Sequence, residues 1–384
     1  MKWEKKKLCE CTEYITDGDH QPAPKADKGV HFIKIKDIVN NQVSFDAQVY
    51  VPQEYYDNLP MERKPQKEDV LYTVVGSFGI PSYVQTDELF CFERNIALLH
   101  PNKDIEPRFL YYSLKNPAFY KGVEIVANGS AQKLIPLSKL KDLKISVPDK
   151  EAQRHIADIL SAYDDLIENN QKQIKLLEEA TQRLYKEWFV DLHFPGYENT
   201  KIVDGVPEGW RINSIYDVFD IKYGKNLPTS KITKAGQYPV YGASGVIGYY
   251  NEKNCDDYAT LVTSRGNGSG DVFRTHHKQS YVTNNSFIAR RNDKNSFIEN
   301  EFTFQLFSNT DFKKLCTGSA QPQLTNTSIQ KIKILLPNRQ LIEKYQRCTI
   351  EMSEKQEALY QEQRALTQAR NRLLPKLMNG TVEV

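Results

Sequence analysis

Residues 129–148 read GSAQKLIPLSKLKDLKISVP, and residues 318–337 read GSAQPQLTNTSIQKIKILLP. Both stretches begin with the same four residues and end in proline, and they align without a gap at an offset of 189. Leu140 then aligns with Ile329, and Lys144 with Lys333. A chance tetrapeptide match would leave the following residues unrelated, so the repeat indicates an internal duplication.

The alignment extends well beyond these stretches. At the same offset Leu184 aligns with Leu373, whereas Trp3 aligns with Trp210 at an offset of 207. The offset is expected to change if loops between the matched segments differ in length. The 384 residues therefore form two related halves of roughly 190 residues each.

The composition is that of an ordinary globular protein, with 40% hydrophobic and 26% charged residues. No apolar run approaches the ~18 residues of a membrane span, and the opening MKWEKKKLCE lacks the apolar stretch of a signal peptide. We therefore expect a cytoplasmic protein without membrane contact. The six cysteines show no framework spacing, and Cys9 and Cys11 lack a second pair for zinc, so we expect free thiols and no metal.

The net charge of +2 is unevenly distributed. Residues 222–291 hold ten Lys and Arg against four acids, and residues 103–144 hold eight basic residues against four acids. Such regions suit phosphate contact, but most charged regions are solvated surface. Charge alone is therefore weak evidence for a nucleic-acid partner.

The end of each half carries a heptad pattern typical of a long helix with a partner helix. Residues 151–188 contain no Pro or Gly, and a helix of about 38 residues would be ~57 Å long. The first seam consists of Ile156, Leu160, Tyr163, Ile167, Asn170, Ile174, Leu177, Thr181, Leu184 and Trp188. The second, weaker seam consists of Tyr345, Thr349, Met352, Gln356, Leu359, Gln363, Leu366, Arg370, Leu373 and Leu377.

Opposite charges favour pairing of these two helices with each other. Residues 149–187 carry nine acids and six bases, a net charge of −3, whereas residues 338–377 carry eight bases and five acids, a net charge of +3. We predict that residues 151–188 and 341–377 form an antiparallel pair. The alternative is that each helix packs only on the residues that precede it.

The residues before the helices form two segments that we call lobe 1 (1–148) and lobe 2 (205–337). Both are rich in Tyr, Val, Ile, Gly and Asn, with short β-like runs such as VHFIKIKDI, DVLYTVVG, YPVYGASGVIGYY and ATLVTSRGNG. Helical stretches include PRFLYYSLKNPAFYKG and NEFTFQLFSNTDFKKL. We predict an α+β chain in which a spacer helix with linker (149–204) follows lobe 1 and a second spacer helix (338–384) follows lobe 2.

Motifs of catalysis are missing from the sequence. The Gly-rich segment 266–270 continues with Asp271 and Val272 instead of the Lys-Ser/Thr of a P-loop, so it predicts a turn between strands. Aminomethyltransferases use Asn/Asp-Pro-Pro-aromatic, and the nearest segment, NPAF at 116–119, lacks the second proline. We therefore predict a non-catalytic binding protein. An enzyme (a methyltransferase or nuclease with a degenerate site) and a coiled-coil scaffold without a DNA role stay as alternatives.

Several segments resemble one family, the specificity subunits of type I restriction–modification systems. The resemblance rests on YKEWFVDLHFPG (185–196) followed by VPEGW (206–210), and on the GSAQ segments that lead into a strand, a proline and a long helix. DGDH (17–20) with GVHFIKIKD (29–37) looks like the opening of one type of target-recognition domain. YPVYGASGVIGYY (238–250) looks like the opening of another.

This resemblance implies two α/β target-recognition domains, related by a pseudo-twofold, at the ends of an antiparallel coiled coil. Each domain would read one half of a split sequence in double-stranded DNA. Two methyltransferase subunits would bring S-adenosylmethionine, and restriction subunits would bring ATP- and Mg-dependent translocation and cleavage, so no cofactor is expected on this chain. The GSAQ segments would lie near the DNA-facing base of each lobe, or would be turns needed only for folding.

Candidate DNA-contacting residues follow from the chemistry of recognition. Arg and Lys suit guanine, Asn and Gln suit adenine, and Lys, Arg and Ser suit phosphates. In lobe 2 the candidates are Lys225, Tyr241, Ser244, Arg265, Asn267, Arg274 and Asn285. In lobe 1 they are His20, Lys25, Lys34, Lys36 and Ser77. The alternative for each is a solvated side chain without such a role.

Overall fold

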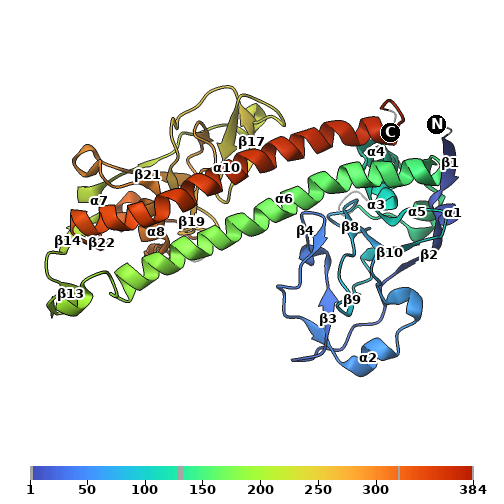
Figure 1. The fold of residues 1–384 in the computed structure, drawn as a ribbon, viewed down its shortest axis with the longest axis horizontal. Coiled ribbons are helices and arrows are strands. Elements are labelled where there is room, and N and C mark those ends of the chain that lie inside the picture. Colours follow the sequence, from blue (N-terminus) through green and yellow to red (C-terminus); the bar gives the residue numbers. More distant parts are fainter. Residues whose placement is uncertain (1–2, 128–132, 319–320, 383–384) are drawn as a thin grey trace. The chain divides into compact units, whose positions relative to one another are not determined.

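The computed structural model describes residues 3–127, 133–318 and 321–382. The chain forms two compact units, which Figure 1 shows as a ribbon. Unit 1 consists of Met1–Asn169 and Gln363–Val384, and unit 2 consists of Asn170–Glu362. Each unit therefore combines one lobe with one end of each long helix.

Unit 1 is built from short strands and short connecting helices. The strands are β1 (Glu4–Lys7), β2 (Thr12–Asp17), β3 (Val30–Ile33), β4 (Ile38–Val39), β5 (Gln42–Val43), β6 (Tyr50–Val51), β7 (Val70–Thr73), β8 (Pro81–Tyr83), β9 (Phe90–Phe92), β10 (Ile96–Pro101) and β11 (Lys144–Val147). The helices are α1 (Leu8–Cys11), α2 (Gln53–Asp57), α3 (Pro107–Lys115), α4 (Pro117–Val126) and α5 (Leu137–Asp142). One antiparallel sheet has the order β2-β10-β7-β8, and a second sheet, β6-β3-β9, contains the parallel pair β3/β9.

Unit 2 has the same organisation. Its strands are β12 (Ile202–Val203), β13 (Val206–Pro207), β14 (Arg211–Ser214), β15 (Phe219–Tyr223), β16 (Tyr238–Tyr241), β17 (Val246–Tyr250), β18 (Thr260–Thr263), β19 (Val272–Arg274), β20 (Tyr281–Val282), β21 (Ser286–Arg291) and β22 (Lys333–Leu336). The helices are α7 (Ile215–Val218), α8 (Asn300–Ser308) and α9 (Asn326–Ile329). The antiparallel sheet has the order β15-β21-β18-β19, and the sheet β17-β16-β20 contains the parallel pair β16/β20.

Strand register shows that the duplication is structural as well as sequential. In unit 1 Thr73 pairs with Ile96 between β7 and β10, and in unit 2 the aligned Thr263 pairs with Ser286 between β18 and β21. Strands near the two ends of each lobe also pair, β1 with β11 and the equivalent β14 with β22. The predicted α+β fold with an internal duplication is confirmed.

Local sequence explains the main elements of each lobe. Strands β7 and β18 are buried along their whole length, which suits their Val, Leu, Tyr and Thr side chains. Helices α3 and α4 both begin with proline, whose missing N–H costs nothing in the first turn. Asn116 separates these helices, and its side chain accepts a hydrogen bond of 3.0 Å from Ala118 N.

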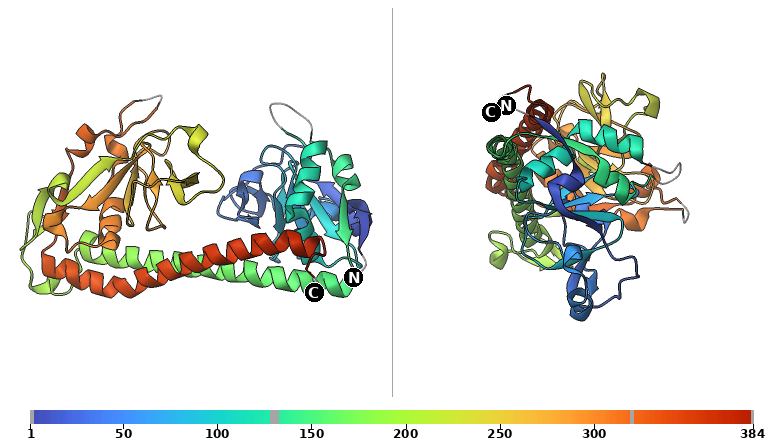
Figure 2. Two further views of the ribbon diagram at one scale, coloured as in Figure 1. Left: turned by 90° about the horizontal axis from the view of Figure 1, so that it is seen from above. Right: turned by 90° about the vertical axis from the view of Figure 1, so that its right-hand side faces the viewer.

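Two long helices, α6 (Lys150–Tyr185) and α10 (Arg339–Met378), run through both units. In unit 1 the start of α6 shares a core with the end of α10, through Leu160 and Leu377. In unit 2 the end of α6 shares a core with the start of α10, through Tyr185 and Tyr345. The helices are therefore antiparallel in each unit, as predicted, and Figure 2 shows their ribbons side by side.

Every residue of both predicted seams is buried or half-buried. The weaker second seam keeps its register despite polar members such as Gln356 and Thr349, which are 3% and 1% exposed. A π-helical turn at Lys186–Val190 follows α6 and brings Trp188 and Phe189 onto the core of unit 2. Within the described residues, no helix is both long enough and apolar enough to cross a membrane.

Candidate nucleic-acid interface

Four loops of lobe 2 lie together, and we call them loop cluster 2. They follow strands β15, β16 and β18 and connect β20 to β21, at residues 224–226, 242–245, 264–270 and 283–285. Ser264 N donates to Asn285 O at 2.8 Å, and Thr283 N donates to Tyr241 O at 2.9 Å. Lys225 forms a parallel β-bridge with Thr283. These backbone links make one surface out of segments that are distant in sequence.

Five of the seven predicted residues of lobe 2 have exposed side chains on this cluster. They are Lys225, Ser244, Arg265, Asn267 and Asn285. The set combines two cations with two amides and a hydroxyl, the groups that reach base edges and phosphates in DNA complexes. Burial raises the pKa of Tyr223 above its ordinary value. The positive charge of the nearby Arg265 guanidinium opposes that rise.

The Gly-rich segment is a turn between β18 and β19, as predicted. Gly270 has a φ of +88°, and a Cβ there would lie 2.8 Å from Lys313 N. Gly266 has a φ of +90°, and its N–H donates to Pro322 O at 3.1 Å. At Gly270 only glycine combines this left-handed backbone with so close an approach, and the hydrogen bond at Gly266 links the segment to Pro322.

Lobe 1 contains the corresponding loop cluster 1, formed by residues 18–20, 34–37, 74–79 and 93–95. Val74 N donates to Asn95 O at 2.9 Å, and Glu93 N donates to Ile33 O at 3.0 Å. Asp19 and Glu93 form a parallel β-bridge. Each of these three links has its counterpart in lobe 2, so the two clusters share one backbone framework.

Of the predicted residues of lobe 1, four lie on loop cluster 1. Lys36, Ser77 and His20 are exposed, and Lys34 is half-buried. His20 Nε2 lies 3.2 Å from a carboxylate oxygen of Asp17. Lys36 and Ser77 occupy the positions that Ser244 and Asn267 occupy in lobe 2.

Lys25 lies apart from the cluster. It is exposed and precedes Ala26, whose N–H donates to Tyr50 O at 3.0 Å beside the edge strand β6. Strand β6 belongs to the three-stranded sheet and not to any of the four loops.

Tyr241 and Arg274 are placed in the interior of unit 2. Tyr241 is 2% exposed, its hydroxyl lies 2.8 Å from His277 Nδ1, and it accepts from His276 N at 2.9 Å. Buried side chains with such partners cannot reach a base, so we leave both residues out of the proposed DNA-contacting set.

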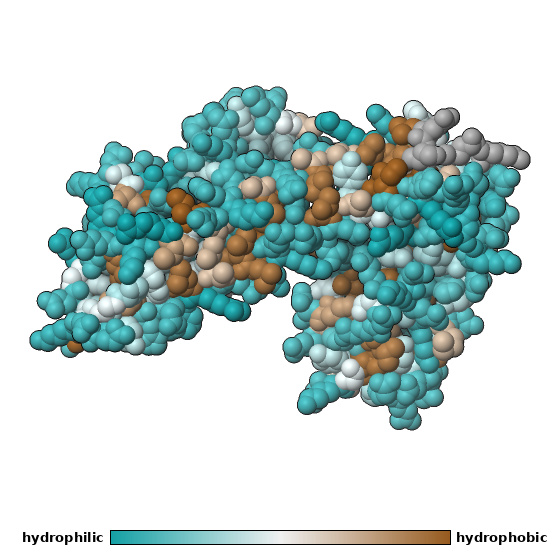
Figure 3. Space-filling model, in the orientation of Figure 1, coloured by the Kyte–Doolittle hydropathy of each residue, from teal (hydrophilic) through white to brown (hydrophobic). Residues whose placement is uncertain are grey.

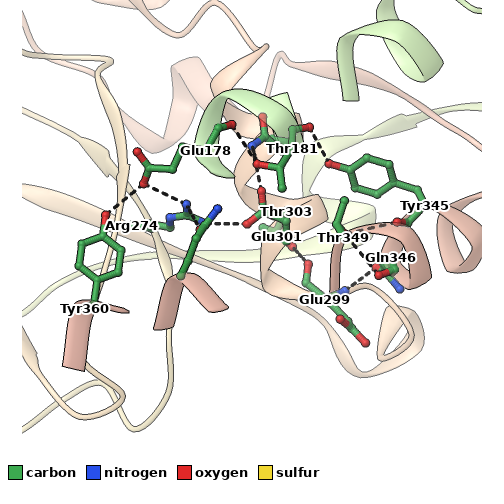
Figure 4. A network of polar contacts seen from close by, with 12 residues as sticks. Glu178, Thr181, Arg274, Glu299, Glu301, Thr303, Tyr345, Gln346, Thr349 and Tyr360 are labelled. Carbon is green, nitrogen blue, oxygen red and sulfur yellow. Dashed lines mark hydrogen bonds and ion pairs between the residues drawn. The ribbon is translucent and has the colours of Figure 1, made fainter. Parts of the chain in front are cut away.

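Arg274 is the centre of an ion-pair network, drawn in Figure 4. Its guanidinium lies 2.5 Å from Glu301 and 3.2 Å from Glu178, and it donates to Gln356 Oε1 at 2.8 Å. Burial alone would lower the pKa of Arg274, but the carboxylates of Glu301 and Glu178 raise it above its ordinary value. Because these partners come from α8, α6 and α10, Arg274 ties lobe 2 to both long helices within unit 2.

Sequence reasoning missed Arg94 on loop cluster 1. Its side chain is exposed on the turn between β9 and β10, where lobe 2 has Asn284. The internal repeat could have revealed it. Asn95 aligns with the predicted residue Asn285 at an offset of 190, which places the neighbouring Arg94 on the equivalent turn of lobe 1.

The second GSAQ segment adjoins loop cluster 2 at its described ends. Thr317 and Gln323 exchange backbone hydrogen bonds of 3.0 and 2.8 Å, and Pro322 O accepts from Gly266 N of the cluster at 3.1 Å. Residues 319–320 and the whole first copy, 129–132, lie outside the described residues. The role predicted for GSAQ therefore stays a prediction.

No group of three or more His, Cys, Asp or Glu that could hold a metal ion occurs in residues 3–127, 133–318 and 321–382.

Similar proteins were found at the level of family, sequence and fold. The profile of the family described as type I restriction modification DNA specificity domain matches residues 1–179 and 207–360. The type I restriction enzyme MjaIX specificity subunit of Methanocaldococcus jannaschii is 26% identical over 318 residues, which cover 76% of this chain and 72% of that protein. The putative type I restriction enzyme MjaX specificity subunit of the same organism is 27% identical over 358 residues, covering 87% and 83%.

A solved structure shares the fold. The crystal structure of the S subunit of a type I restriction-modification system from M. genitalium superposes with a TM-score of 0.62 at 20% sequence identity. The alignment covers 98% of this chain and 96% of that one.

Proposed function

Because the chain belongs to the type I restriction–modification DNA specificity family, we propose that it reads a bipartite DNA sequence for partner subunits that carry out the chemistry. Lobe 1 (1–148) and lobe 2 (205–337) are the two recognition domains in this proposal. One observation carries it: the two loop clusters share their backbone links but differ in exposed side chains, as in Ser77 against Asn267. A common framework with different side chains suits two readers of different half-sites.

The proposed DNA-contacting set contains ten of the predicted residues. In double-stranded DNA, exposed Arg, Asn and Lys side chains reach base edges in the major groove, and Ser and Lys contact phosphates. The set consists of Lys225, Ser244, Arg265, Asn267 and Asn285 in lobe 2 and His20, Lys25, Lys34, Lys36 and Ser77 in lobe 1.

The long helices are the proposed docking surface for two methyltransferase subunits and for restriction subunits. Exposed apolar side chains support this, since α6 carries Ile159 at 37%, Leu166 at 46% and Leu176 at 65% exposure. Figure 3 shows such hydrophobic side chains along the long helices. Large apolar side chains that gather on an exposed helix face suit an interaction surface. In this proposal the chain is a non-catalytic, cytoplasmic protein, and its partners bind S-adenosylmethionine, ATP and magnesium.

Methylome sequencing of cells with and without this gene tests the proposal. We expect one bipartite methylated motif, with an unread gap of constant length, that disappears when the gene is deleted. A motif that persists without the gene, or a continuous motif, would contradict the reading of two half-sites.

Two biochemical results would favour other functions. Methyl transfer to DNA by the purified chain without partners would identify an enzyme. A gel-shift assay with mixed-sequence duplex at low and high salt would identify a scaffold if binding were absent at both, because phosphate contact makes affinity fall steeply with salt.

A further inference from the structure

The two loop clusters carry their exposed arginines on different loops. In lobe 2, Arg265 is exposed on the loop after β18, and the equivalent position in lobe 1 is Val75, which is half-buried. In lobe 1, Arg94 is exposed on the turn between β9 and β10, and the equivalent position in lobe 2 is Asn284, which is half-buried. The exposed arginine therefore lies on a different loop in each repeat.

The two loops concerned are direct neighbours in both lobes. Val74 N donates to Asn95 O at 2.9 Å, and Ser264 N donates to Asn285 O at 2.8 Å. Each lobe thus has an exposed arginine next to this hydrogen bond. In lobe 1, Arg94 precedes the acceptor Asn95, and in lobe 2, Arg265 follows the donor Ser264.

The other arginines of lobe 1 have partners within unit 1. Lobe 1 contains three arginines, Arg63, Arg94 and Arg108. Arg63 lies 3.3 Å from Asp19, and Arg108 lies 3.4 Å from Asp165 and 5.7 Å from the ring centre of Tyr83. Among residues 3–127, 133–318 and 321–382, the side chain of Arg94 makes no ion pair or hydrogen bond.

The turn that carries Arg94 is held in place by its neighbour Glu93. Glu93 N donates to Ile33 O at 3.0 Å, and its carboxylate accepts from Ile35 N at 2.7 Å. Ile96 N donates to Glu93 O at 3.1 Å, which closes the turn. A guanidinium on a fixed turn is well suited to bidentate recognition, because little backbone freedom is lost on binding.

From these observations we propose that Arg94 is a specificity-determining residue of lobe 1, which reads a guanine in the half-site that this lobe binds. The chemistry is bidentate donation from the guanidinium to O6 and N7 of guanine in the major groove. Arg265 serves lobe 2 in the same way from the neighbouring loop. This inference rests on the proposed function, because it needs each lobe to read its own half-site.

The test uses the full chain, expressed with its methyltransferase subunits in a host free of DNA methylation, with the methylated motif read by sequencing. The variants are Arg94→Ala, Arg94→Lys and Arg265→Ala. Lys67→Ala is a matched control, because Lys67 is an exposed cation of lobe 1 that pairs with Asp87 at 3.6 Å, outside the loop cluster.

We expect Arg94→Ala to lower the preference for guanine at one position of one half-site by about tenfold or more, and Arg265→Ala to change only the other half-site. Arg94→Lys should keep part of the preference, because lysine also donates to guanine but lacks the planar fork of donors. Lys67→Ala should leave the motif as it is.

Three outcomes would overturn the assignment of Arg94. They are an unchanged motif with Arg94→Ala, changes by Arg94→Ala and Arg265→Ala in the same half-site, and a lower level of methylation with Arg94→Ala at an unchanged motif, which would indicate a phosphate contact. Loss of methylation at all sites by a folded, assembled Arg94→Ala complex would also count against base reading. A wild-type complex without a bipartite motif would instead refute the proposed function itself.

Discussion

Glycine at two equivalent positions lets each loop cluster form. A Cβ on Gly18 would lie 2.2 Å from Phe92 O, and a Cβ on Gly224 would lie 2.3 Å from Thr283 O. Real Cβ atoms do not approach a carbonyl so closely. Only glycine therefore lets the chain that leaves β2 lie against the parallel pair β3/β9, and the chain that leaves β15 lie against the pair β16/β20. The neighbouring bridges, such as that between Asp19 and Glu93, depend on this approach.

Replacing Gly18 with alanine is expected to destabilise unit 1 by about 1–3 kcal/mol, because the added methyl must displace backbone. Denaturant unfolding measures the effect. Gly122→Ala is the matched control, since a Cβ at this position in α4 would meet its nearest atom, in Leu143, at 3.9 Å, and alanine favours a helix. Equal stability of Gly18→Ala and wild type would show that the contact is not tight.

Residue chemistry predicted much of the candidate site but not its buried exceptions. Lys225 follows Gly224 and Arg265 precedes Gly266, so their types and places near glycines indicated exposed loops, and the structure places them there. Arg274 also lies at the end of a strand, but its partners Glu178 and Glu301 come from helices far away in the sequence. No local pattern reveals such partners, so the burial of Arg274 could not be predicted.

At the scale of elements, one buried ionic cluster holds each lobe onto the long helices within its unit. In unit 2, Arg274 is 17% exposed and Glu301 is 6% exposed. In unit 1, Asp164 of α6 contacts Lys115 of α3 and Arg370 of α10. The two clusters have opposite central charges, an arginine in unit 2 and an aspartate in unit 1.

Replacing Arg274 with methionine is expected to lower the free energy of unfolding by about 3–5 kcal/mol, because Glu301 is left buried without its cation. Arg183→Ala is the comparison, as Arg183 is 82% exposed and 3.5 Å from Glu179 one turn away, a pair worth about 0.3–0.5 kcal/mol. Adding Glu301→Leu to Arg274→Met should recover much of the loss in urea unfolding. No recovery would mean that packing, and not charge, sets the cost.

The cluster of unit 1 predicts a specific dependence on pH. Burial alone would raise the pKa of Asp164, but Lys115 and Arg370 lower it below the ordinary value of 3.8. A carboxyl with a lowered pKa stabilises the fold above the pKa of the unfolded state, and this stabilisation is lost as the pH falls through the pKa of the folded state.

Asp164→Asn should therefore be less stable than wild type at pH 7, and the difference should shrink as the pH falls below about 4, near the ordinary pKa of aspartate. Thermal unfolding at pH 7 and pH 3 measures it. Asp165→Asn provides the control, because Asp165 is 55% exposed and pairs with Arg108 at 3.4 Å. A difference that is the same at both pH values would indicate lost packing.

The long helices were predictable because a heptad seam is a local pattern repeated many times. Residues 151–188 and 341–377 were expected, and the structure gives Lys150–Tyr185 and Arg339–Met378. The order of the strands, β2-β10-β7-β8, was not predictable, because it joins segments whose separations are set by loops. The repeat predicts only that both lobes share one order.

For the molecule as a whole, the helices are proposed as a ruler that sets the gap between half-sites. Seven residues inserted after Lys172, with a matching seven in α10, keep both seams in phase. The insertion adds ~10 Å of helix, about three base pairs at 3.4 Å each. The gap in the methylated motif should lengthen by about two to four base pairs while both half-sites stay the same.

Seven residues inserted at the hairpin tip between Asp204 and Gly205 are the control, since they lie outside both seams and should leave the gap unchanged. If the double insertion folds and methylates with the original gap, the helices do not set the spacing.

The pairing of strands near the two ends of each lobe has an evolutionary consequence. Glu4 faces Val147 across β1 and β11, and Arg211 faces Leu336 across β14 and β22. In each lobe, the strand near its start therefore lies beside the strand that leads into a spacer helix. Genetic crossovers within those strands would exchange a complete lobe and leave the helical seams unchanged. In the proposed function, such an exchange would give the protein a new half-site in one genetic event while the pairing of the helices is kept.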